Sequence, residues 1–226
     1  MLGKTIFSNL FRVKILLVAA TSAEIESVTQ QFFSDSGHGF SCDLNFLITG
    51  VGMVNTAYEL TKTLCVVKPD FCIQAGIAGS FNNKYKIGDV VNVREDFFSE
   101  LGAESGDDFI SASDLGLMSG VGVANDFSDS VLYDGFKFLP EVRGVTVNTV
   151  HGNEKSIQNI LIRLNPDVES MEGAAFLQIC HREKVKCVQI RSISNVVERR
   201  KKENWNIPLA VKNLNDYLIH FLSEIR

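Results

Sequence analysis

Residues 185–195 read VKCVQIRSISN, and they contain the stretch that decides the fold class. The first six of these residues are mostly apolar and β-branched, which is typical of a short strand buried on both faces of a sheet. Polar residues begin at Arg191, and the stretch stops at Asn195, which either closes the strand or faces a ligand. Because a strand buried on both faces needs a covering layer on each, the stretch predicts an α/β protein.

Strand and helix patterns alternate along the rest of the chain. Apolar runs predict strands at 13–19, 44–49, 71–75, 88–93, 144–150 and 185–193. Apolar residues at helical spacing predict helices at 23–33, 53–67, 154–164, 171–184 and 207–223. We interpret the whole chain, 1–226, as one domain with an N-terminal extension at 1–12.

One internal segment lacks a clear pattern. Residues 99–120 are rich in Gly, Ser and Asp and have weak periodicity. We expect a long functional loop there, or an excursion that contacts a partner.

Composition disfavours several classes of ligand. The net charge of -5 argues against nucleic acid, because phosphate binding requires a basic surface. The basic run at 199–202 lies between Glu198 and Glu203 and is typical of a solvated loop. The four histidines have no metal-ligand spacing, so we expect no metal. No apolar run approaches ~20 residues, so we expect no membrane span.

The cysteines indicate a reducing compartment. All five lie in apolar segments without a CxxC pair, which is typical of small core residues with free thiols. The apolar residues after Lys4 loosely resemble a signal peptide, but Arg12 and Lys14 interrupt them. We therefore expect a cytoplasmic protein.

Several predicted strands end in small or acidic residues, and ligands of α/β folds bind at such ends. Glu24 follows the first strand, where a capping box with Thr21 is an equally good explanation. Residues 49–55 (TGVGMVN) lack the third glycine of a dinucleotide fingerprint. Residues 74–80 (QAGIAGS) either form a tight turn or allow a flat ligand to lie against the backbone.

A second acidic strand end occurs at 168–176 (VESMEGAAF). Glu172 lies at a predicted helix start, which is a common structural position for an acid. Two glutamates around Ser-Met, followed by Gly-Ala-Ala, are nevertheless an unusual entry to a helix. A carboxylate there can accept hydrogen bonds from two neighbouring hydroxyls, as a ribose diol requires.

Taken in order, TGVGMVN, GIAGSF, MEGAAF and RSISN resemble motifs of the nucleoside phosphorylase and nucleosidase superfamily, over about residues 13–222. The nearest branches are the methylthioadenosine/S-adenosylhomocysteine nucleosidases and, closer still, the futalosine hydrolases. The resemblance implies a three-layer α/β/α sandwich around a mixed, partly closed sheet. It also implies cleavage of a purine nucleoside at its N-glycosidic bond, without a cofactor, by a homo-oligomer (a dimer or larger) in which 99–120 can complete a neighbouring site.

The resemblance assigns expected roles to nine residues. Glu24 matches the glutamate that activates the attacking water, and Asn195 matches the residue that engages the leaving base. Glu172 matches the residue that binds the 2′- and 3′-hydroxyls of the ribose. The other positions line the sugar and the base or orient Asn195: Ile77, Ala78, Gly79, Ser170, Met171 and Ser194.

Two departures from the pattern refine the expected reaction. The methylthioadenosine nucleosidases have aspartate at the position of Asn195, and an amide suits a 6-oxopurine better because it can donate to O6. Bacterial phosphorylases have arginine at the position of Gln74, which lacks the charge that phosphate would require.

We therefore expect hydrolysis of futalosine to hypoxanthine and dehypoxanthine futalosine, in the alternative menaquinone pathway. A methylthioadenosine/S-adenosylhomocysteine nucleosidase, a 6-oxopurine nucleoside phosphorylase and a non-catalytic nucleoside-binding protein remain as alternatives.

Overall fold

The computed structural model describes residues 12–34, 42–106, 108–125 and 131–225. Its main sheet runs in the order β10-β4-β8-β9-β3-β1-β2, with β7 paired to β4. The strands are β1 (Lys14–Ala19), β2 (Asp43–Ile48), β3 (Phe71–Ser80), β4 (Val90–Phe98), β7 (Gly122–Ala124), β8 (Glu141–Thr146), β9 (Val168–Ser170) and β10 (Lys186–Val196).

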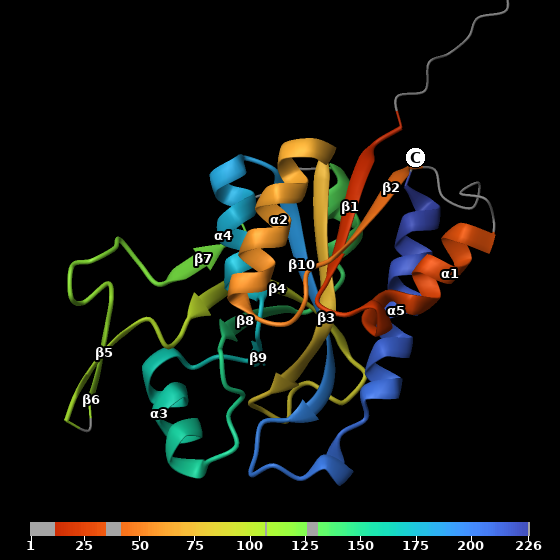
Figure 1. Ribbon diagram of the computed structural model, residues 1–226. Helices are drawn as coiled ribbons and strands as arrows, with labels where there is room; N and C mark the ends of the chain where they lie inside the picture. Colours follow the sequence, from red (N-terminus) through yellow and green to blue (C-terminus); the bar gives the residue numbers. More distant parts are fainter. Residues whose placement is uncertain (1–11, 35–41, 107, 126–130, 226) are drawn as a thin grey trace, which may run out of the picture.

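Helices cover both faces of this sheet (Figure 1). They are α1 (Glu26–Ser34), α2 (Met53–Val67), α3 (Glu154–Leu164), α4 (Gly173–Glu183) and α5 (Ile207–Glu224), with short 3-10 turns η1 (Ser22–Ile25), η2 (Val131–Phe136) and η3 (Lys202–Asn204). No helix in the described ranges is long and apolar enough to cross a bilayer.

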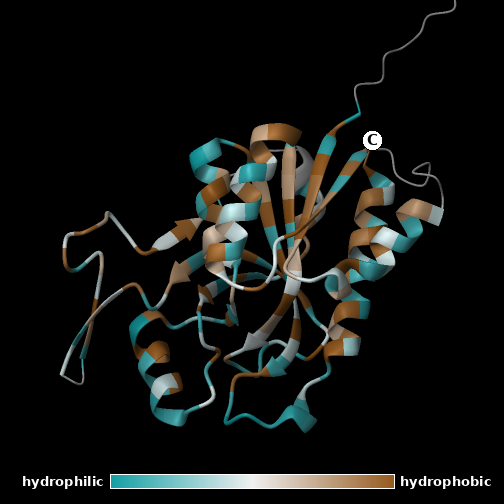
Figure 2. Cartoon of the chain, in the orientation of Figure 1, coloured by the Kyte–Doolittle hydropathy of each residue, from teal (hydrophilic) through white to brown (hydrophobic). Residues whose placement is uncertain are grey.

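Strand β1, which lies between β3 and β2, shows why three layers form. Its odd-numbered residues, such as Ile15 and Leu17, pack in a core cluster with α5. Leu16 and Val18 face the other way and pack with α2 and α4. Both faces of the strand are apolar, while the outer faces of the helices are mixed or polar (Figure 2). The α/β/α layering that the apolar strands predict is confirmed.

The sheet closes on itself around one ring of strands. β10 pairs with β3 in parallel and with β4 antiparallel, so β3, β10, β4, β8 and β9 form a closed circuit. The parallel pairs β1–β3 and β1–β2 extend the sheet beyond the ring. This arrangement confirms the mixed, partly closed sheet.

Several predicted boundaries differ from the structure. β3 continues through Gly76 and Gly79 to Ser80, where the glycines suggested a turn, because the ring provides strand partners on both sides. The segment 99–120 is not simply a loop: β5 (Gly102–Ser105) and β6 (Asp108–Ser111) form a hairpin that extends from the body (Figure 1). The strand predicted at 144–150 begins at Glu141 and ends at Thr146. Most of the expected N-terminal extension, residues 1–11, lies outside the described residues.

Candidate active site

One cavity lies at the carboxyl ends of β1, β3 and β10, which meet because these strands are parallel neighbours. Its volume of about 400 Å³ is suited to a nucleoside-sized ligand. The structure brings to its wall all nine residues that were singled out from the sequence: Glu24, Ile77, Ala78, Gly79, Ser170, Met171, Glu172, Ser194 and Asn195.

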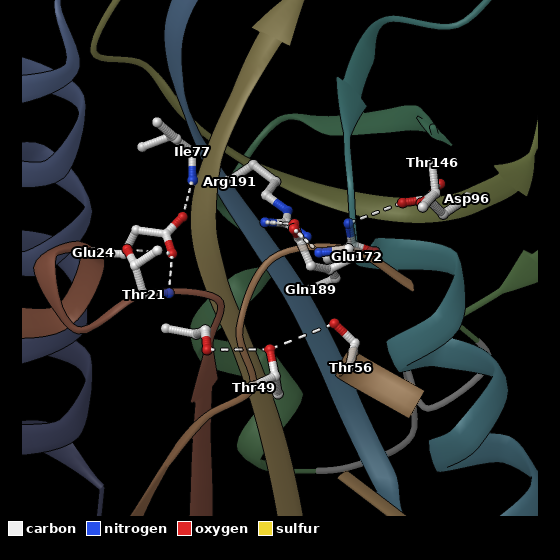
Figure 3. A network of polar contacts seen from close by, with 12 residues as sticks. Thr21, Glu24, Thr49, Thr56, Ile77, Asp96, Thr146, Glu172, Gln189 and Arg191 are labelled. Atoms are coloured by element: carbon white, nitrogen blue, oxygen red, sulfur yellow. Dashed lines mark hydrogen bonds and ion pairs between the residues drawn. The ribbon is translucent and has the colours of Figure 1, made fainter. Parts of the chain in front are cut away.

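Glu24 is held on the cavity wall by donors from two elements. The backbone N–H of Thr21 donates to its Oε2 at 2.9 Å, and the hydroxyl of Thr21 lies 3.1 Å from the same oxygen. The backbone N–H of Ile77, on β3, donates to Oε1 at 3.2 Å (Figure 3). The hydrogen bonds between Thr21 and Glu24 that cap the turn therefore also orient the Glu24 carboxylate on the cavity wall.

Glu172 is positioned by the glycine loop before α2. The backbone N–H of Gly52 donates to Glu172 Oε1 at 3.0 Å. Arg191 Nη1 lies 3.6 Å from Glu172 Oε2 (Figure 3). Gly52 has a φ of 96°, a backbone conformation that favours glycine. The TGVG loop therefore binds a carboxylate of the protein itself. Each oxygen of Glu172 retains acceptor capacity for a ligand hydroxyl.

Arg191 is a buried cation within the strand that was predicted at 185–193. Arg191 lies in β10 and is almost completely buried. Among the described residues, its Nε and Nη2 have no hydrogen-bond partner. A Cβ on Gly76 would overlap Arg191 Nη1 and lie 2.9 Å from Glu24 Oε1. Only glycine at 76 therefore leaves room for both charged groups beside β3.

A buried polar network supports the start of α4. Gln189 Nε2 donates to Asp96 Oδ2 at 3.0 Å, and the Thr146 hydroxyl donates to Oδ1 at 2.8 Å. The Thr146 hydroxyl in turn accepts the N–H of Ala174 at 2.7 Å. Burial raises the pKa of Asp96 to about 6, against the opposing effects of these donors and of Arg191. The network fixes the first turn of α4, next to Glu172.

The amide of Asn195 has a defined orientation. Its Nδ2 donates to the carbonyl oxygen of Val196 at 3.0 Å, and its Oδ1 accepts from the Ser194 hydroxyl at 2.8 Å. An amide nitrogen has two protons and an amide oxygen accepts two hydrogen bonds. Asn195 therefore keeps one donor and one acceptor for a ligand, and Ser194 is an orienting neighbour.

Two further groups on the cavity wall were not predicted from the sequence. His151 and the buried Glu169 form a pair, with 2.7 Å between His151 Nδ1 and Glu169 Oε2. Arg200 and Trp205 lie together on the wall, with the guanidinium carbon 5.2 Å from the ring centroid. Glu169 belongs to the VESMEG motif, which was a signal for it. Arg200 belongs to the basic run at 199–202 that was interpreted as a solvated loop, and His151 and Trp205 lie in segments without a pattern.

Gln74, which was singled out for its lack of charge, is buried in β3 and is not part of the cavity wall. Across the described ranges, no group of three or more His, Cys, Asp or Glu side chains is arranged to hold a metal ion.

Sequence comparison extends to most of the chain. The futalosine hydrolase of Acidothermus cellulolyticus is 29% identical over 218 residues, which cover 89% of this chain and 87% of that protein. The 5′-methylthioadenosine/S-adenosylhomocysteine nucleosidase of Bacillus subtilis is 25% identical over 193 residues, or 81% of each chain.

Solved structures share the fold. Futalosine hydrolase of Helicobacter pylori superposes with a TM-score of 0.75 at 16% identity, covering 94% of this chain and 98% of that one. The sequence-family model described as the phosphorylase superfamily matches residues 14–223, which include every strand of the ring and all nine residues that were singled out from the sequence. The chain therefore belongs to the phosphorylase superfamily.

Proposed function

We propose that the protein hydrolyses the N-glycosidic bond of futalosine, releasing hypoxanthine and dehypoxanthine futalosine in the alternative menaquinone pathway. Cleavage of a ribosyl–purine bond develops positive charge on the sugar and negative charge on the base. In the proposed reaction Glu172 binds the ribose diol, Glu24 accepts a proton from the attacking water, and Asn195 stabilises the departing base.

The observation that carries the choice of base is the orientation of the Asn195 amide. Its remaining N–H can donate to O6 of hypoxanthine, and its remaining lone pair can accept from a protonated N7. A 6-aminopurine offers a donor at the position of O6, where the amide N–H also donates. The geometry therefore supports a 6-oxopurine over the adenine of methylthioadenosine.

Hydrolysis is favoured over phosphorolysis by the charges near Glu24. The carboxylate of Glu24 would repel a phosphate anion while it activates water. Gln74, at the position where phosphorylases have arginine, is neutral, but it lies off the cavity wall, so the preference for hydrolysis rests on Glu24. The relatives named hydrolase and nucleosidase add support for water as the nucleophile.

The test is incubation with futalosine in phosphate-free buffer, with hypoxanthine release followed by chromatography. We expect release by the wild type and a loss of about 10²–10⁴-fold in kcat for Glu24→Gln. Glu26→Gln, an exposed change in the first turn of α1, is the matched control and should retain activity. Release that requires added phosphate would indicate a phosphorylase, and faster cleavage of methylthioadenosine would indicate the adenine-specific alternative.

We also propose a cytoplasmic location and assembly as a homo-oligomer. All five cysteines are free thiols, which persist in a reducing compartment. Val54 and Tyr58 are exposed on α2 beside the loop that holds Glu172. Exposed apolar side chains of this kind are typical of a surface that a second subunit covers.

A further inference from the structure

His151 and Glu169 form a buried polar pair that the proposed reaction does not use. Glu169 Oε2 lies 2.7 Å from His151 Nδ1, and the backbone N–H of His151 donates to both oxygens of Glu169, at 3.1 and 3.3 Å. The Phe81 ring packs edge-to-face on the imidazole. Both members of the pair line the cavity. The side chain of Glu169 is only 4% exposed, so burying its charge is unfavourable unless a partner such as His151 offsets the lost hydration.

The strand register places this pair opposite Asn195. Gly79 of β3 is the register partner of Asn195 on one side and of Glu169 on the other. Residues directly opposite each other across strands project from the same face of a sheet. A Cβ on Gly79 would lie 2.9 Å from Val197 Cγ2, 3.2 Å from Asn195 Nδ2 and 3.6 Å from Glu169 Cγ. The glycine therefore lets the Asn195 amide and Glu169 lie close together on one face of β3, with Val197 packed between them.

The pair also determines the hydrogen-bonding character of the imidazole. An ionised carboxylate only accepts hydrogen bonds, so the proton of a neutral His151 lies on Nδ1, where it donates to Glu169. Nε2 is then a hydrogen-bond acceptor, and it is the ring nitrogen left for a ligand. A buried acceptor at this position favours ligands that present an N–H donor to it over ligands that present a lone pair.

We propose that His151 is a specificity-determining residue that accepts the N1–H of a 6-oxopurine, with Glu169 as the positioning residue that fixes its tautomer. This assignment rests on the proposed function, because it places the purine in the cavity with Asn195 at O6 and N7. N1 and N7 lie on opposite sides of C6, so the two flanking groups read the two sides of the same base. Adenine has an unprotonated N1, which would face the lone pair of Nε2.

The test compares futalosine with the analogue that carries a 6-amino group in place of the 6-oxo group. We expect His151→Phe, which retains a ring against Phe81, to lower the 6-oxo to 6-amino ratio of kcat/KM by about tenfold. Glu169→Gln should lower it further, because its amide can donate to Nδ1 and so move the imidazole proton to Nε2. The matched controls are His220→Phe and Glu224→Gln, an exposed His–Glu pair on α5, which should leave the ratio unchanged.

If His151 and Glu169 only stabilise the backbone of residues 147–153, a different result is expected. Both variants would then lower kcat/KM for the two substrates equally, or change only the melting temperature, and the assignment would be wrong. If His151→Phe does not fold, Glu169→Gln alone decides through the same ratio.

If the wild type cleaves neither substrate, the proposed function fails, and binding of free bases still tests the assignment. Calorimetry should then show the wild type binding hypoxanthine at least about tenfold more tightly than 1-methylhypoxanthine or adenine. Loss of that preference in both variants supports the assignment. A preference that persists in them, or its absence in the wild type, overturns it.

Discussion

The side-chain amide of Asn195 has its nitrogen toward the carbonyl oxygen of Val196 and its oxygen toward the hydroxyl of Ser194. The reverse orientation would bring two oxygens together at Val196. A carboxylate at this position would do the same in either orientation, so the surrounding backbone is suited to an amide. The preference for asparagine is thus set by local geometry as well as by the proposed base.

Replacing Asn195 by aspartate should therefore impair the proposed reaction. We expect Asn195→Asp to lower kcat/KM for futalosine by about tenfold or more and to shift the preference toward 6-aminopurine nucleosides. Asn213→Asp is a suitable control, because the Asn213 amide also donates to a backbone carbonyl, that of Gly88, but lies outside the cavity. Identical treatment of both bases by both proteins would contradict this interpretation of Asn195.

Individual cavity residues could be singled out mainly through the resemblance to the superfamily, because each of them alone also has a structural explanation. Glu24, Glu172 and Asn195 could be assigned to one site before the strands were seen to meet. The His151–Glu169 pair could not, since it depends on β9, a strand of only three residues. The burial of Arg191 was also unforeseen, because a charged residue within a strand pattern usually marks its end.

At the scale of elements, the first turn of α4 depends on close contact with β4 and β10. A Cβ on Gly173 would overlap Asp96 Oδ2 and Gln189 Nε2. The glycine that follows Glu172 is thus a packing requirement of the buried network.

Gly173→Ala should lower the free energy of unfolding by about 1–3 kcal/mol, because the added methyl must displace the network. Urea denaturation measures this change. Gly120→Ala, at a position with no neighbour within 4 Å of the added Cβ, is the control and should have little effect. Equal stability of both variants would show that α4 can shift without cost.

The same network predicts how stability depends on pH. The pKa of Asp96 is raised from 3.8 to about 6, so in this interval the folded state retains a proton that the unfolded state has lost. The contribution of Asp96 to stability is therefore complete below the lower value and is lost as the pH rises through the higher one. Asp96→Asn should remove this part of the slope, as measured by urea denaturation at several pH values between about 4 and 7. An unchanged slope would exclude Asp96 as its source.

Elements were predicted well where one pattern dominates. The buried strand β1 and the capped helix α5, whose Asn206 side chain accepts from Leu209 N–H, agree with the sequence prediction. The extension of β3 through two glycines was missed, because small residues have weak strand preference and the partner strands β9 and β10 are distant in sequence. The hairpin at 102–111 lacks a strong alternation and was expected to be irregular.

At the scale of the whole molecule, the exposed apolar side chains on α2 lie next to the cavity. Val54 is 81% exposed and Tyr58 is 63% exposed, although the neighbouring Val51 lines the cavity wall. A subunit that covers this face would lie close to the cavity. The proposed oligomer is therefore relevant to activity as well as to stability.

Introducing charge on this face should dissociate the proposed oligomer. We expect Val54→Glu combined with Tyr58→Glu to lower the mass measured by sedimentation to that of one chain, because a buried unpaired charge is unfavourable. Ile162→Glu, a change of an equally exposed residue on α3, should leave the mass unchanged. A wild type that sediments as a single chain would refute the proposed assembly.

The closed circuit of strands has a consequence for the order in which a new chain acquires its site. Glu24 is synthesised early, but β10, which carries Asn195 and joins β3 to β4, is among the last elements to be made. A ribosome-bound chain that ends before residue 186 lacks both the closing strand and the side chain proposed to engage the base. Pairings between segments so distant in sequence also form slowly, because much chain entropy is lost before any contact is gained. Nascent chains are therefore expected to gain ligand affinity in a single late step, when β10 enters between its two neighbours.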